Sequence, residues 1–211
     1  MISLYMLEYH VAKLRLSRDL RFYKSIRRFV EPAFVYWYME KKDFVIRKAV
    51  REDTALILEF IKGIAKYEKM ENEVEATVEI LEEQLFDKCR AEVIFAVESG
   101  KEVGFALFFH NFSTFVGRGG LYLEDLYVCP EHRGKGYGKA LFMELVKIAR
   151  ERRCGRMEWV CLNWNTPSIG FYRSLGAVPL DEWTTYRLTE DALSRLLATE
   201  IVDYKRTKRN C

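Results

Sequence analysis

The chain has 211 residues, of which 49% are hydrophobic and 31% are charged. This composition is typical of a soluble globular protein with one well-filled core, and no apolar run reaches the ~18 residues of a membrane-spanning helix. The net charge of +3 hides a split, because residues 1–42 carry +5, residues 205–209 carry +4 and the residues between them carry −6. An acidic body would favour a cationic small substrate, although it also simply keeps a surface solvated.

The cysteines and histidines indicate neither a disulfide framework nor a metal site. The chain has five cysteines and no CxxC pair, which favours a reducing compartment and therefore a cytoplasmic location. The three histidines, His10, His110 and His132, are too scattered for zinc-ligand spacing, so we expect no metal.

The two ends of the chain differ in composition from the rest. Residues 1–42 are basic and aromatic and contain no glycine, and they lack the apolar run and cleavage site of a signal peptide. They form either a membrane-surface or nucleic-acid-binding arm, or an extension that the working protein does not need, with a true start at Met39. We favour the second interpretation and expect no membrane or nucleic-acid partner. Residues 201–211 form a basic C-terminal tail.

Hydrophobic periodicity predicts an α/β (α+β) domain over residues 43–200. We expect strands at 44–50, 92–97, 103–110, 122–128, 157–162 and 183–188, and helices at 52–67, 77–86, 135–153, 166–175 and 190–197. Residues 111–120 are expected to form a polar loop that contains glycine. The meander in the first half implies antiparallel pairing, and the strand–helix–strand crossover over 121–162 implies parallel pairing. The sheet is therefore mixed, mostly antiparallel and flanked by helices.

One stretch, residues 122–141, organises the chain, and its sequence is YLEDLYVCPEHRGKGYGKAL. It predicts a buried strand, a turn marked by proline, a glycine-rich loop and then a helix. Backbone N–H groups and the helix dipole make such a junction a phosphate-binding arrangement. It is neither a Walker loop nor the dinucleotide fingerprint, because glycines at 134, 136 and 138 form no GxGxxG.

Two motifs carry a resemblance to a known family. The pattern R-x-x-G-x-G begins at Arg133 after a strand that ends in LYV, and NTPSIGFYRSLGA begins at Asn165. Together they resemble the acetyl-CoA motif and the following helix of the GCN5-related N-acetyltransferases, the GNAT superfamily. The resemblance covers about residues 44–197. It implies the GNAT fold, a sheet splayed at a parallel central strand pair, with acetyl-CoA as cosubstrate.

The motifs AKYEKME from Ala65, YLEDLYV and NxPSIxFY narrow this resemblance to the spermidine/spermine N-acetyltransferase branch, which includes the thialysine acetyltransferases. Members of this branch usually form homodimers. The resemblance implies that strand backbone pairs with the pantetheine arm, that loop amides hold the pyrophosphate and that an asparagine contacts the cofactor. The matching residues are Leu126, Tyr127 and Val128, then Arg133, Gly134, Lys135, Gly136, Tyr137 and Gly138, and finally Asn165.

The same resemblance assigns the catalytic and substrate-binding residues. Tyr172 would be the general acid, and Glu124 would bind the amine and help to deprotonate it. Tyr67 and Glu68 would line the polyamine end of the site. These assignments suit the chemistry, because a charged alkylamine must lose a proton before it attacks a thioester and the leaving thiolate must gain one. Strand alternation places Glu124 and Asp125 on opposite faces, so we expect Asp125 to be solvated or hydrogen-bonded elsewhere.

The substrate loops depart from the polyamine pattern. Residues 112–120, FSTFVGRGG, contain no carboxylate, and Thr184 and Thr185 stand where another acid is expected. This departure favours a thialysine-like amino acid or a short diamine over spermine or spermidine. Two other functions stay open: acetylation of a protein N-terminus or lysine, and a CoA-binding module without turnover.

Overall fold

The structure is a computed structural model that describes residues 44–209, with side chains as far as residue 199. The extension predicted for residues 1–42 and the side chains of the basic tail therefore lie outside the described residues. The described part divides into two units, the first ending at Val160 and the second beginning at Cys161. Each unit is described below by itself.

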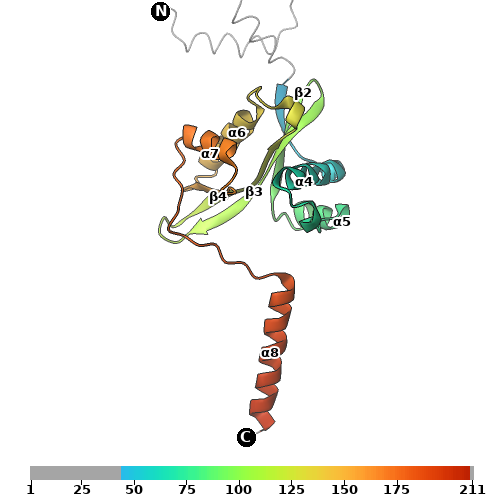
Figure 1. Cartoon of the computed structure of the whole chain (residues 1–211), viewed down its shortest axis with the longest axis vertical. Helices are drawn as coiled ribbons and strands as arrows, with labels where there is room; N and C mark the ends of the chain where they lie inside the picture. Colours follow the sequence, from blue (N-terminus) through green and yellow to red (C-terminus); the bar gives the residue numbers. More distant parts are fainter. Residues whose placement is uncertain (1–43, 210–211) are drawn as a thin grey trace, which may run out of the picture. The chain divides into compact units, whose positions relative to one another are not determined.

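In the described part of the chain, the first unit is a five-stranded sheet in the order β1–β2–β3–β4–β5. Helices α4 and α5 cover one face of the sheet and α6 covers the other (Figure 1). The strands are β1 (Phe44–Lys48), β2 (Glu92–Glu98), β3 (Lys101–Ser113), β4 (Arg118–Val128) and β5 (Met157–Glu158). The helices are α4 (Thr54–Glu68), α5 (Val78–Glu82), which continues as a π-helical turn over Glu83–Asp87, and α6 (Tyr137–Glu151). Short 3-10 turns lie at Arg51–Asp53, Glu71–Glu73 and Pro130–His132.

The strand pairing confirms the predicted mixed sheet. Strands β1 to β4 pair antiparallel in sequence order, and β4 pairs parallel with β5. The parallel register is short, because it joins Leu121 to Met157 and Tyr122 to Glu158, and β5 is shorter than the strand predicted at 157–162. Beyond Leu123, β4 pairs with β3 alone in the described part of the chain.

The predicted loop at 111–120 is wrong over most of its length. Strand β3 continues to Ser113 and β4 begins at Arg118, so a four-residue turn connects them. Asn111 pairs with Gly120 in this ladder, and a Cβ at Gly120 would lie 2.3 Å from Asn111 Oδ1. The glycine that suggested a loop therefore allows a close side-chain approach within a strand.

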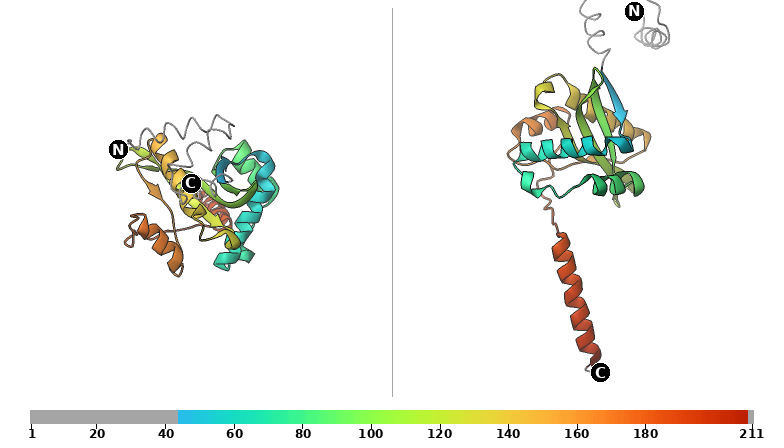
Figure 2. Two further views of the ribbon diagram at one scale, coloured as in Figure 1. Left: turned by 90° about the horizontal axis from the view of Figure 1, so that it is seen from above. Right: turned by 90° about the vertical axis from the view of Figure 1, so that its right-hand side faces the viewer.

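The core is built from the apolar faces that the sequence predicts. On the α4 face, the Phe60 ring stacks on Phe105 with 5.2 Å between centroids, above buried residues of β2 and β3. On the other face, Leu141 and Leu145 of α6 are fully buried. The right-hand view of Figure 2 shows α4 crossing the strands of the sheet.

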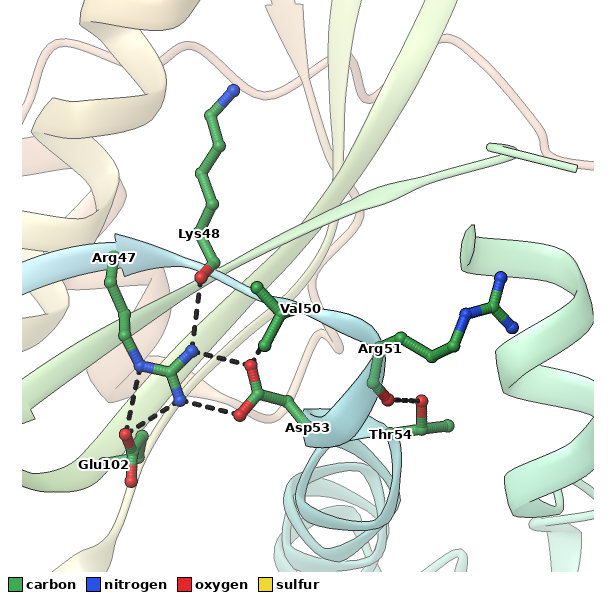
Figure 3. Close-up of polar contacts among 7 residues, drawn as sticks. All are labelled: Arg47, Lys48, Val50, Arg51, Asp53, Thr54 and Glu102. Carbon is green, nitrogen blue, oxygen red and sulfur yellow. Dashed lines mark hydrogen bonds and ion pairs between the residues drawn. The ribbon is translucent and has the colours of Figure 1, made fainter. Parts of the chain in front are cut away.

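An arginine fork fixes the start of α4. Arg47 of β1 donates to Asp53 over 2.6 Å and 2.8 Å and to Glu102 of β3 over 2.8 Å and 3.1 Å. Figure 3 shows this guanidinium between the two carboxylates. The hydrogen bond from Arg47 lowers the pKa of Asp53. The fork ties α4 to two strands, and the opposite end of α4 carries the predicted site residues Tyr67 and Glu68.

The second unit contains α7 (Thr166–Ser174) and α8 (Glu190–Arg209). The strand predicted at 183–188 is wrong: this segment has no regular structure, and Trp183 and Tyr186 are exposed. A strand needs a partner for its backbone groups, and the described residues provide none. The helix predicted at 190–197 is longer in the structure and continues through most of the basic tail.

Candidate functional site

A β-bulge sits at the predicted catalytic residue Glu124. Asp125 pairs with Leu107 and Leu123 pairs with Phe108, so Glu124 has no partner on β3. Bulges interrupt the alternation of side chains and often occur beside active sites. The simple alternation assumed for Glu124 and Asp125 therefore fails at this point of β4.

Three carboxylates lie close together beside this bulge. Burial, together with the negative charges of Glu124 and Glu68, raises the pKa of Asp125 to about 7. Burial also raises the pKa of Glu68, at the C-terminal end of α4. The Asp125 side chain is half-buried on β4, next to the exposed Glu124. The expectation of a solvated or hydrogen-bonded Asp125 stays a prediction, while burial and the two neighbouring acids raise its pKa.

The predicted substrate residue Tyr67 lies beside the cofactor loop. The guanidinium carbon of Arg133 lies 4.8 Å from the centre of the Tyr67 ring and 5.5 Å from that of Tyr127. Arg133 Nε donates to the carbonyl of Val128 over 2.9 Å. These contacts bring the end of α4, the end of β4 and the first residue of the loop together.

The glycine-rich loop at residues 133–138 opens toward the start of α6. Gly134 and Gly136 have φ values of 80° and 89°, a left-handed conformation that residues with a Cβ rarely adopt. Gly136 precedes the first turn of α6, and its carbonyl accepts from the Ala140 amide over 3.0 Å. The amides of Gly138 and Lys139 belong to that first turn and have no acceptor within the helix. This geometry is suited to an anion at the helix N-terminus.

The loop side chains converge on Glu98, the last residue of β2. Lys135 Nζ lies 3.1 Å from both carboxylate oxygens, His132 Nδ1 lies 2.7 Å from Oε2, and the Tyr137 hydroxyl donates to Oε1. The hydrogen bond from Tyr137, with those from Lys135 and His132, lowers the pKa of Glu98 to about 2. Glu98 is therefore a carboxylate at neutral pH, and Lys135 is already paired.

The other predicted residues, Asn165 and Tyr172, belong to the second unit. The Asn165 side chain caps α7 by accepting from the Ser168 amide over 3.3 Å. Tyr172 lies two residues before the end of α7, with its ring centroid 5.2 Å from that of Phe171. The cap explains why an asparagine stands at 165, while its contact with a cofactor and the role of Tyr172 stay predictions.

The described residues hold no group of three or more histidine, cysteine or acidic side chains that could bind a metal ion. The three carboxylates beside the bulge therefore do not form a metal site. None of the described helices is long and apolar enough to cross a membrane.

The first unit thus combines a mixed sheet, a bulged strand and a glycine loop at a helix N-terminus. The family model described as the Acetyltransferase (GNAT) family matches residues 58–177. The chain belongs to this family and is an acetyltransferase. Its structure is similar to an integron cassette protein from the mobile metagenome of V. cholerae, with a TM-score of 0.62, 29% identity and coverage of 74% of this chain and 98% of that one.

Two curated relatives are similar in sequence. A thialysine N-epsilon-acetyltransferase of Sus scrofa is 32% identical over 164 residues, which are 72% of this chain and 96% of that protein. An L-ornithine N5-acetyltransferase of Arabidopsis thaliana is 41% identical over 93 residues, which are 44% of this chain and 41% of that protein. The resemblance to the branch that includes thialysine acetyltransferases is thereby confirmed.

Sequence reasoning missed the contributions of two residues, Asp125 and Glu98. Asp125 follows Glu124 directly, but the bulge that turns it toward Glu68 leaves no mark in the local pattern. Glu98 lies 34 residues before His132, and only the fold brings them together.

Proposed function

We propose that the protein transfers an acetyl group from acetyl-CoA to a primary amine of a small cationic substrate, which is a thialysine-like amino acid, a diamine or a polyamine. The observation that carries this proposal is the half-buried Asp125 carboxylate, which interacts electrostatically with Glu124 and Glu68. Three neighbouring acids disfavour their own ionisation, and a bound ammonium group would relieve that cost. An ammonium substrate therefore fits this site better than an anionic or apolar one.

Acetyl-CoA suits the features of β4 and the loop. The β4 backbone at Leu126, Tyr127 and Val128 would pair with the pantetheine arm, because β5 does not extend along this part of β4. The loop amides and the first turn of α6 would hold the pyrophosphate. Lys135 is engaged by Glu98, so we assign this role to the amides rather than to the lysine ammonium.

The reaction proceeds by direct attack within a ternary complex. Glu124 accepts a proton from the ammonium group, directly or through water, and the neutral amine nitrogen attacks the thioester carbonyl. The C–N bond forms as the C–S bond breaks, and the CoA thiolate takes its proton from the Tyr172 hydroxyl. The nitrogen then loses its second proton to the tyrosinate, which restores Tyr172 and leaves the neutral amide. The products are the N-acetylated amine and free CoA.

Of the possible amines, we favour a basic amino acid with a side-chain amine or a short diamine. The sequence around the β3–β4 turn contains no carboxylate that would bind a distal amine. The names of both curated relatives also specify an amino acid with a side-chain amine.

A panel of amines tests this proposal, with thiol release from acetyl-CoA as the readout. We expect thialysine, ornithine or putrescine to give a higher kcat/KM than spermidine or a peptide with a free N-terminus. A preference for the peptide would contradict the small-amine assignment and favour acetylation of a protein.

A further inference from the structure

Glu98, the last residue of β2, binds side chains in and beside the glycine-rich loop at residues 133–138. Its carboxylate contacts His132, Lys135 and Tyr137, which are the residues that flank the two left-handed glycines. Gly134 lies between the first two of these contacts and Gly136 lies between the last two. Each of the two left-handed glycines is therefore flanked along the chain by residues whose side chains bind the same carboxylate on the sheet.

The same anchor extends to β1. The Tyr137 ring stacks on Phe44 with 4.9 Å between centroids and an interplanar angle of 10°. Phe44 pairs directly with Glu98 in the β1–β2 ladder. The start of α6 is thus fixed to two neighbouring strands, one through a ring stack and the other through a carboxylate.

A carboxylate beside a proposed anion-binding site needs an explanation, because it would repel the bound anion. Glu98 occupies the Lys135 ammonium and places a negative charge beside the proposed pyrophosphate site, which Coulomb repulsion would disfavour. If Glu98 favours ligand binding, it must therefore do so by an effect other than its charge. A glycine loop that is free to move must be ordered when it binds its ligand, and that ordering costs affinity. A loop that is already held avoids this cost.

We propose that Glu98 is a positioning residue for cosubstrate binding, which fixes the loop so that its backbone amides face the pyrophosphate before acetyl-CoA arrives. This inference rests on the proposed function, since it takes acetyl-CoA as the ligand of the loop. Glu98 contacts the loop side chains rather than the backbone amides that would bind the pyrophosphate. It acts through the three loop residues that it contacts.

The test compares two acetyl donors in the full-length protein. Acetyl-CoA reaches the loop, whereas S-acetylpantetheine ends before the pyrophosphate. For Glu98→Ala we expect the Kd for CoA, measured by calorimetry, to rise about tenfold, equivalent to 1.4 kcal/mol. We expect kcat/KM with S-acetylpantetheine to stay within about twofold of wild type, because that donor does not use the loop. A merely structural role would lower the use of both donors equally, and that result would overturn the proposal.

Glu102→Ala is the matched control. Glu102 is also an ion-paired carboxylate on the β2–β3 hairpin, but it contacts Arg47 rather than the loop. We expect this variant to alter stability without changing the preference between the two donors.

If Glu98→Ala does not fold, Glu98→Gln tests the positioning role instead, since the amide keeps an acceptor oxygen. We expect a smaller loss in the same direction, again confined to CoA. An unchanged Kd for CoA in a folded Glu98 variant would overturn the inference alone. A wild-type protein that does not bind CoA would instead overturn the proposed function.

Discussion

Asp125 and Glu124 are adjacent in the sequence but have different environments. Glu124 is exposed at the bulge, whereas Asp125 is partly buried beside α4. Glu124 can therefore exchange protons with water and with an incoming ammonium group. Asp125 is better suited to attract and hold that cation, because its own charge is disfavoured until a counter-charge arrives.

The raised pKa of Asp125 predicts a pH-dependent stability. In the folded protein its pKa is about 7, against 3.8 for an unperturbed aspartate, so the folded state binds more protons between these values. Stability is then greatest below pH ~4 for this group and falls as the pH rises to ~7. Asp125→Asn removes this penalty and should be more stable than wild type at pH 8, by up to about 4 kcal/mol.

Urea unfolding at pH 5 and pH 8 measures this effect. The exposed Asp181 provides a control for the substitution itself, because Asp181→Asn removes no buried carboxylate and should leave the free energy of unfolding at pH 8 close to that of wild type. Equal stability of wild type and Asp125→Asn at pH 8 would contradict the burial of this carboxylate.

Tyr172→Phe tests the proposed general acid. Removing the hydroxyl should lower kcat by about 10²- to 10⁴-fold, because the thiolate then lacks its proton donor. The Kd for acetyl-CoA should change little. Tyr186→Phe, which alters an exposed tyrosine of the same unit, should leave kcat as it is. An unaltered kcat in Tyr172→Phe would remove this residue from the mechanism.

At the scale of elements, the loop before α6 depends on backbone conformation more than on side chains. Gly136→Ala forces a Cβ into the left-handed region and should lower the free energy of unfolding by about 1 kcal/mol. Gly138→Ala is the control, since Gly138 lies inside α6 and a Cβ there would only touch Val128 at 3.8 Å. Thermal unfolding of both variants checks this, and an equal or higher Tm for Gly136→Ala would contradict the strain argument.

The elements that sequence predicted well are those in which the hydrophobic periodicity agrees with the capping and turn residues at their ends. Helix α6 has a clear apolar stripe, and Thr77 caps α5 by accepting from the Ile80 amide over 3.3 Å. The β3–β4 turn was misplaced because glycines serve there as strand residues. The bulge at Glu124 was invisible because it depends on the register with β3, which no local pattern encodes.

The candidate site was partly predictable for the same reason. The loop glycines and Tyr67 lie in contiguous motifs, so the sequence alone could propose them as site residues, and the structure places Tyr67 beside Arg133. The grouping of Glu68 with Asp125, and of Glu98 with the loop, joins residues far apart in the sequence. Such pairs require the fold.

For the whole molecule, the acidic charge of residues 43–204 agrees with a cationic substrate. The homodimer and the cytoplasmic location stay predictions, as does the start at Met39. The curated thialysine acetyltransferase is covered over 96% of its length by this chain, so the comparison concerns the catalytic domain as a whole.

The central claim is that acetyl transfer to an amine is the activity of this chain. Its most direct test incubates the wild-type protein with acetyl-CoA and thialysine. Free thiol and N-acetylated product are measured in the same reaction. We predict that thiol release requires the amine and that both products form in equal amounts. Binding of CoA without amine-dependent thiol release, across the whole amine panel, would contradict the claim and indicate a CoA-binding module.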